Sequence, residues 1–138
     1  MVIMSKFWGL AGVILIAGIV GLLAAQDSEE INFTDIETEC REERTEEVQV
    51  RVVNNTILYS GHFPVQNTEA DMRYNFDRSG DRITLNVRAI NDEEPERFER
   101  DCYATGVYRA STVEYNGRYT LVTRHNGEQV DKRIVNFR

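Results

Sequence analysis

Apolar and polar positions alternate along most of the chain after residue 30. Val48, Val50 and Val52, for example, alternate with polar residues, which is the period of a strand with one buried face. The same pattern predicts further strands over residues 31–39, 56–63, 69–76, 82–90, 103–114, 119–124 and 129–137. Strands repeating about every ten residues, with no helical period between them, are typical of a sandwich or barrel. We therefore expect an all-β fold, an antiparallel β-sandwich of seven or eight strands in an immunoglobulin-like arrangement.

Turn-forming residues separate the predicted strands. Residues 69–76 and 82–90 flank Gly80 and predict a β-hairpin. Asparagine tolerates the left-handed backbone conformation, and the Asn-Gly pair favours two-residue hairpin turns. Turns are expected at one Asn-Asn pair and two Asn-Gly pairs: Asn54-Asn55, Asn116-Gly117 and Asn126-Gly127.

An uncharged apolar run precedes the strands. Nineteen residues from Phe7 to Ala25 carry no charge. This length is close to the roughly 20 residues of a spanning helix, whereas a secretory signal peptide has a shorter apolar stretch and a small-residue cleavage site. Leu22 or Leu23 would lie three residues before a cut at the alanine pair, where a small residue is preferred. We expect residues 1–26 to be either an uncleaved membrane anchor or a cleaved signal peptide.

The charges around the apolar run indicate where the rest of the chain lies. Lys6 precedes the run and acidic residues follow it, as the positive-inside rule requires for an N-terminus on the cytoplasmic side. We expect residues 27–138 to form a single extracytoplasmic domain, since a segment of this length can bury its own core. It would be anchored in the membrane through residues 7–25 or secreted.

The chain is acidic, and its basic residues are nearly all arginine. It has 23 Asp and Glu against 16 Lys and Arg, a formal net charge of -7, and Lys6 and Lys132 are its only lysines. Molar salt shortens the Debye length to about 3 Å and screens repulsion among carboxylates, while arginine still pairs with them in bidentate fashion. The composition favours a high-salt exterior over an ordinary acidic secreted domain, and it argues against nucleic acid as a partner.

Cys40 and Cys102 are the only cysteines. In an oxidising compartment two cysteines most simply form one disulfide. The bridge would close a loop of about 62 residues, which the chain-entropy argument values at roughly 4 kcal/mol. Neither cysteine has a second metal ligand at short spacing, so we expect a disulfide and no metal site.

Several strand and turn motifs carry a resemblance to a known group. They are Cys102-Tyr-Ala-Thr-Gly-Val-Tyr108-Arg-Ala110, Asn116-Gly117, Val122-Thr-Arg-His125-Asn-Gly127-Glu128, Asp77 to Ala89 and Thr38-Glu39-Cys40. Together they resemble small secreted β-sandwich proteins and lipoproteins of halophilic archaea, over roughly residues 38 to 130. The resemblance implies a β-sandwich and a salty habitat. Members often carry further cysteines that this chain lacks, and the group has no assigned activity.

A few single residues suggest chemistry. Asn32 and Asn54 each begin an Asn-X-Thr sequence, the acceptor pattern for N-glycosylation, and Asn54 is the better candidate because it lies in a predicted turn. His62 and His125 have no nearby residues that would complete a catalytic or metal site. We expect both histidines to be ordinary surface or edge residues near strand ends.

Two kinds of cluster leave alternatives open. Acidic clusters could bind Ca²⁺ through their oxygens, but arginines interrupt them and the calcium-loop spacing is absent, which favours a solvated acidic surface. They comprise Glu42, Glu43, Glu46 and Glu47, and Asp92, Glu93, Glu94 and Glu96. Tyrosines in the last third could form a binding face, although core and cross-strand packing is the simpler interpretation. They are Tyr103, Tyr108, Tyr115 and Tyr119.

No catalytic constellation or cofactor motif stands out in the sequence. We expect a non-enzymatic cell-surface or secreted β-sandwich module with a structural or binding role, an unknown protein or glycan partner and no cofactor. One alternative is an assembly subunit that adds a strand to a neighbour's sheet edge. The other is a hydrolase with an unrecognised site.

Overall fold

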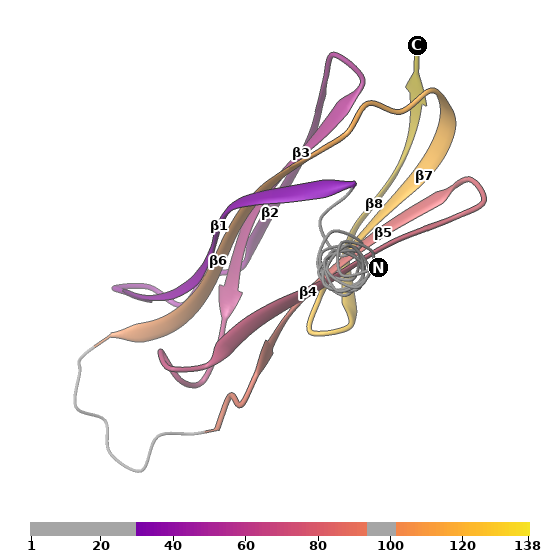
Figure 1. Ribbon diagram of the computed structural model, residues 1–138. Coiled ribbons are helices and arrows are strands. Elements are labelled where there is room, and N and C mark those ends of the chain that lie inside the picture. The colour runs from indigo at the N-terminus through magenta and orange to yellow at the C-terminus, as the bar shows by residue number, and fades with distance from the viewer. Residues whose placement is uncertain (1–29, 94–101) are drawn as a thin grey trace, which may run out of the picture.

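The structure is a computed structural model that describes residues 30–93 and 102–138 (Figure 1). The predicted anchor or signal peptide, residues 1–26 with its apolar run 7–25, lies outside the described residues. Within the part that is described, no helix is long and apolar enough to cross a membrane.

Eight strands make up the described chain, which confirms the all-β prediction and its number of strands. They are β1 (Ile31–Arg41), β2 (Glu47–Val53), β3 (Thr56–Pro64), β4 (Asp71–Ser79), β5 (Arg82–Ile90), β6 (Tyr103–Thr112), β7 (Gly117–His125) and β8 (Glu128–Phe137). Each predicted strand corresponds to one of them, because the alternation of apolar and polar residues continues through nearly the whole of each.

The strands form two four-stranded layers (Figure 1). The first sheet has the order β1-β6-β3-β2 and the second has the order β4-β5-β7-β8. The described neighbours pair antiparallel, except β5 and β7, which are parallel. The prediction of an antiparallel sandwich is therefore wrong for this pair. The chain leaves the second sheet after β5, returns through the first as β6 and re-enters beside β5 in the same direction.

The hairpin turn predicted at Asn116-Gly117 is also wrong. β6 belongs to the first sheet and β7 to the second, so residues 113–116 carry the chain from one layer to the other (Figure 1). Gly117 has a φ of 100°, a conformation that favours glycine. The Asn-Gly pair thus marks a sharp change of direction, but the strands on either side of it do not pair.

The other predicted turns connect paired strands. Asn54-Asn55 joins β2 to β3 with φ values of 51° and 64°, and Asn126-Gly127 joins β7 to β8 with 52° and 83°. Two positive φ values match the turn that suits the twist of a two-residue hairpin. The hairpin predicted from residues 69–76 and 82–90 is confirmed as β4 and β5, with Gly80 at a φ of 61°.

The predicted disulfide between Cys40 and Cys102 is present, with 5.5 Å between the Cα atoms. Cys40 lies in β1 and Cys102 directly precedes β6, so the bridge joins neighbours within one sheet. In immunoglobulin domains both sheets are antiparallel, and the conserved bridge joins the two sheets. The immunoglobulin-like prediction is not confirmed.

The core lies between the layers. In β5, Ile83, Leu85 and Val87 are fully buried, as their alternation predicts. On edge strand β2 the alternation holds less well, because Val50 is buried while Val52, near the end of the strand, is exposed. The largest fully buried side chains come from β3 and β6, the central strands of the first sheet: Ile57, Tyr59, Phe63 and Tyr108.

The strand register divides the connections between two ends of the sandwich. We call the end where the chain enters at Glu30 the entry end. There Val113 donates to the carbonyl of Glu30 (3.0 Å), and the side chain of Asn55 donates to the carbonyl of Arg138 (2.7 Å). The opposite end, the far end, holds the disulfide, the loop of residues 42–46 and the Asn126-Gly127 turn.

Candidate functional site

His125, predicted as an ordinary surface or edge residue, is buried between the two sheets with only 3% of its surface exposed. It is the last residue of β7 and lies before a turn, as expected. The prediction of a surface residue is wrong because its partners come from the first sheet and from the loop before β2, far away in sequence.

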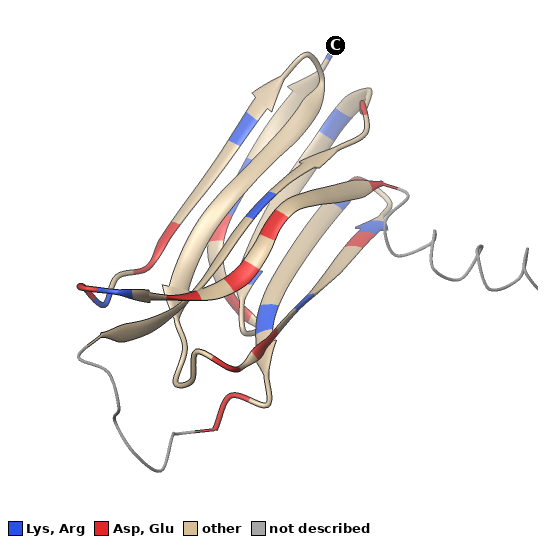
Figure 2. Cartoon of the chain, turned by 60° about the vertical axis from the view of Figure 1, so that its left-hand side comes forward, with Lys and Arg blue, Asp and Glu red and all other residues tan. Residues whose placement is uncertain are grey.

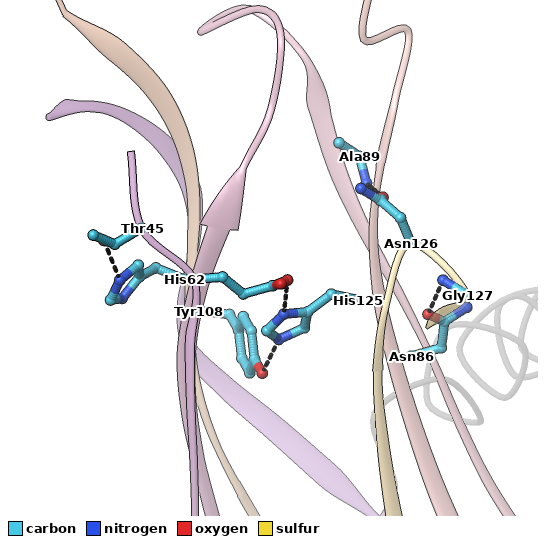
Figure 3. Close-up of polar contacts among 9 residues, drawn as sticks. Thr45, His62, Asn86, Ala89, Tyr108, His125, Asn126 and Gly127 are labelled. Carbon is cyan, nitrogen blue, oxygen red and sulfur yellow. Dashed lines mark hydrogen bonds and ion pairs between the residues drawn. The ribbon is translucent and has the colours of Figure 1, made fainter. Parts of the chain in front are cut away.

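Both ring nitrogens of His125 have polar partners. Nε2 lies 2.7 Å from the hydroxyl of Tyr108, and Nδ1 lies 2.9 Å from Oε2 of Glu46. Figure 3 shows the phenol and the imidazole facing each other across the interior. A carboxylate only accepts hydrogen bonds, which assigns the proton to Nδ1, and Nε2 then accepts from the Tyr108 hydroxyl. With the imidazole neutral, Glu46, His125 and Tyr108 each have a hydrogen-bond partner.

A glycine and an aromatic ring shape the space around this chain of hydrogen bonds. Gly61 of β3 lies opposite Tyr108 in the register, and a Cβ there would lie 2.6 Å from the tyrosine hydroxyl oxygen. Glycine is therefore needed for the phenol to reach His125. The ring of Phe63 stacks on the imidazole with centroids 4.6 Å apart.

Two asparagine side chains fix the end of β7. The side-chain oxygen of Asn126 accepts from the Ala89 N–H (2.9 Å), and that of Asn86 accepts from the Gly127 N–H (3.0 Å) (Figure 3). Both bonds tie the β7–β8 turn to β5. The backbone of the residue next to His125 is thus held in place, and the imidazole keeps its position.

Burial determines the protonation of this group. It lowers the pKa of His125, because a charged ring would lose its hydration, and the nearby Glu46 carboxylate opposes this effect. Burial also raises the pKa of Tyr108, and the charge of Glu46 adds to the increase. His125 is accordingly neutral and Tyr108 protonated at neutral pH.

The Glu46 carboxylate, the His125 imidazole and the Tyr108 hydroxyl are hydrogen-bonded in series, as the groups of a general-base relay are. A general base must lie within about 2.6–3.2 Å of the proton it removes from a substrate. Tyr108 is 2% exposed, and its hydroxyl is already engaged by His125. What the geometry supports is a clamp that joins β6, β7 and the loop containing Glu46.

His62 lies on the outer face of the first sheet, whereas His125 lies on its inner side. Nε2 of His62 is 2.9 Å from the Thr45 hydroxyl (Figure 3). His62 also lines a hollow of about 170 Å³ together with Asp35 and Glu47. This volume is below the roughly 300–1,000 Å³ of ligand pockets. Because the two histidines lie on opposite sides of the first sheet, they do not combine into one site.

A larger groove, of about 520 Å³, lies next to this hollow on the same face. We call it the arginine groove, because the described residues of its lining include Arg51 and Arg109 but no Asp or Glu. The serine and threonine residues Thr34, Ser60 and Ser111 also line it. In a chain with more acidic than basic residues, such a lining is a local reversal of charge.

The strand register places the arginine groove over the middle of the first sheet. Arg109 on β6 pairs with Ser60 on β3, and Ser60 in turn pairs with Gln49 on β2. On β1 the register shifts at Thr34, whose hydroxyl donates to the carbonyl of Arg109 at 3.3 Å. Such a bulge re-aims side chains.

The guanidinium groups of Arg51 and Arg109 form neither ion pairs nor hydrogen bonds with the described residues. Sequence reasoning missed this groove because its members come from four strands. In the sequence they are alternate polar residues, which any solvated strand face would show.

The predicted glycosylation acceptors are both accessible. Asn54 is exposed in the β2–β3 turn, as expected, and Asn32 is exposed on β1. Nothing in the structure tests attachment of a glycan, so glycosylation stays a prediction.

The tyrosines of the last third mostly belong to the core. Tyr108 and Tyr115 are buried, and Tyr119 packs against Tyr115 with ring centroids 5.7 Å apart. Tyr103 differs, because half of its surface is exposed. The core interpretation is confirmed for three of the four side chains.

The acidic residues of the first cluster, Glu42, Glu43, Glu46 and Glu47, are exposed, as the solvated interpretation predicts. In the second cluster Asp92 accepts from the N–H groups of Gln66 and Asn67, each at 2.8 Å, and so holds a loop. Glu94 and Glu96 lie outside the described residues. Within residues 30–93 and 102–138, no three His, Cys, Asp or Glu side chains converge as metal ligands would.

Comparisons with models of protein families, with curated proteins and with solved structures find no match to this chain. The resemblance to halophilic proteins over residues 38–130 stays a prediction. The arginine groove and the buried histidine are therefore the basis on which a function is inferred.

Proposed function

We propose that this protein is a non-enzymatic extracytoplasmic binding module whose ligand occupies the arginine groove. The observation that carries the proposal is a pair of guanidinium groups, Arg51 and Arg109, that have no partner among the described residues and line a groove of about 520 Å³. That volume is within the range of ligand sites. The burial of His125 and Tyr108 supports a structural use of the hydrogen-bonded chain over a catalytic one.

The cellular location is part of the proposal. Residues 27–138 would lie outside the cytoplasm, secreted or anchored through residues 7–25. The disulfide between Cys40 and Cys102 supports this location weakly, because disulfides persist in oxidising compartments. The acidic, arginine-rich composition supports a salty exterior.

The alternative role, assembly by strand addition, has less support. The edges of the two sheets are β1, β2, β4 and β8, and each carries charged side chains. β1 also contains the bulge at Thr34, and Arg133 donates to the Val50 carbonyl of β2. Charges, bulges and covered backbone groups hinder the pairing of an edge with another chain. Binding through the groove is therefore preferred.

Binding of the purified full chain to isolated cell envelopes of the producing organism tests the proposal. The full chain is kept in solution with a non-ionic detergent. Ser60→Trp would fill the groove, and Thr84→Trp is a matched control on a central strand of the second sheet, again on the outer face. We expect the groove variant to lower envelope binding by about tenfold, a loss of about 1.4 kcal/mol, and the control to bind normally. Equal binding by both variants, or no binding by the wild type, contradicts the proposal.

A further inference from the structure

We propose that the arginine groove binds an acidic polysaccharide through the carboxylates of its uronic acid units. This inference rests on the proposed function and adds the class of ligand. Three features of the groove support it: its charge, the spacing of its two arginines and the nature of its other side chains.

The charge of the groove selects an anionic ligand. Arg51 and Arg109 contribute two positive charges, and none of the described residues that line the groove is Asp or Glu. A guanidinium group binds a carboxylate through two parallel hydrogen bonds. Since neither group has a partner among the described residues, a ligand carboxylate would not have to displace an ion pair.

The spacing of the arginines suits a chain-like ligand. Arg51 lies on β2 and Arg109 on β6, with β3 between them and an offset of two residues along the strands. With strands about 4.8 Å apart and a rise of about 3.3 Å per residue, their Cα atoms are about 12 Å apart. At this spacing a polymer can offer a separate carboxylate to each arginine along the groove.

The remaining side chains favour a sugar over a protein. Ser60, Ser111 and Thr34 supply hydroxyl groups, and Gln49 supplies an amide, all suited to hydrogen bonds with sugar hydroxyls. Leu58 offers one apolar contact. Protein interfaces are enriched in aromatic residues, methionine and arginine and depleted in serine. The arginines suit either class of ligand, but the two serines and the burial of Tyr59, the one aromatic residue among the described lining residues, favour a sugar.

The groove is also built on rigid elements. Its side chains project from four hydrogen-bonded strands of one sheet. A site on a fixed scaffold loses little conformational freedom when a ligand binds, which favours affinity. The exposed Asp35 pairs with Arg109 in the register. Asp35 and Glu47 line the adjoining hollow with Arg109 and are acidic residues that could oppose an anionic ligand.

Calorimetric titration of the full chain, in detergent and dilute salt, with a trigalacturonate oligosaccharide tests the inference. The corresponding neutral galactose trisaccharide is the ligand control. We expect saturable binding of the acidic sugar, weakened by about tenfold or more when Arg51→Gln and Arg109→Gln are combined. Arg82→Gln combined with Arg118→Gln removes the same charge from exposed positions of the second sheet, and this control should bind as the wild type does.

Any of the following results overturns the inference: no binding of trigalacturonate, equal loss in both double variants, or equal affinity for the neutral sugar. Groove-dependent binding of polyglutamate in place of trigalacturonate also overturns it, and identifies an acidic protein segment as the ligand. If trigalacturonate fails while Ser60→Trp still abolishes envelope binding, the proposed function stands and only the class of ligand is wrong.

Discussion

At the scale of single residues, His125 connects the two sheets through a neutral imidazole. Nδ1 donates to Glu46 and Nε2 accepts from Tyr108, so both ring nitrogens and the tyrosine hydroxyl have a partner. A proton added to Nε2 would remove the acceptor of the Tyr108 hydroxyl and place a charge where little water can reach it. Loss of one partner from a buried polar group costs about 1–3 kcal/mol. Acid should therefore weaken the clamp.

The free energy of unfolding should fall as the pH drops below about 6.5. Burial lowers the pKa of His125 from 6.5 in the folded state, so the unfolded chain takes up the proton first. The contribution of His125 is complete above the unfolded pKa and is lost as the pH falls toward the folded pKa. Urea unfolding midpoints between pH 7.5 and 5.0 would measure the effect.

The variant His125→Phe tests the origin of this pH dependence. It keeps an aromatic ring beside Phe63 but cannot be protonated, so the decrease between pH 7.5 and 5.0 should become smaller. An unchanged pH profile in His125→Phe would show that another group is responsible.

At the scale of elements, one side chain links the edge strand β2 of the first sheet to the edge strand β8 of the second. Arg133 of β8 donates to the Val50 carbonyl of β2 at 2.7 Å, and Asp131 orients the guanidinium through bonds of 2.9 and 3.0 Å. On the opposite side of the sandwich, the rings of Phe33 on β1 and Tyr74 on β4 lie 4.3 Å apart. The layers are thus joined at both margins as well as through the core.

Arg133→Ala should destabilise the fold by about 1 kcal/mol, since hydrogen bonds from charged groups are worth about 1.5–3 kcal/mol and exposure reduces this value. The side chain of Arg133 is 43% exposed. Arg118→Ala, at an exposed position of β7, is the control and should change stability by less than about 0.5 kcal/mol. Chemical denaturation compares the two variants, and equal midpoints would mean that the Val50 contact contributes nothing measurable.

At the scale of the whole molecule, negative charge is spread over the surface. Acidic residues recur along β1 and in the loops of the far end, as Figure 2 shows. With a net charge of -7, repulsion among them opposes the compact state in dilute salt. The arginines offset part of this repulsion, most strongly where they form pairs, as Arg133 does with Asp131.

Molar KCl should therefore stabilise the protein by about 1 kcal/mol or more, a rise of roughly 4–8 °C in the unfolding midpoint. Thermal unfolding in dilute buffer and in molar KCl measures the change. Replacing Asp35, Glu37 and Glu39 by their amides removes three carboxylates from β1 and should reduce the gain. Identical midpoints in the two salt conditions would exclude the high-salt adaptation.

Strands could be predicted well because their signal is local. In β5, Ile83, Leu85 and Val87 alternate with polar residues and are all buried. Asn116-Gly117 shows the limit of such signals, because a turn motif does not determine whether the strands on either side pair with each other or separate into two sheets. Because β6 and β7 lie in different sheets, β7 pairs with β5 instead of with β6, and this pairing is parallel.

The sequence by itself determined the all-β class, the positions of the strands, one disulfide and an acidic, arginine-rich surface, because alternation, cysteine number and charge are properties of local composition. Only the tertiary structure decided the parallel pair, the burial of His125 and the arginine groove. His125 and Glu46 are 79 residues apart in sequence, and the groove combines side chains from four strands. Contacts of this kind depend on strand order and register, which set the neighbours of each side chain after the chain has folded.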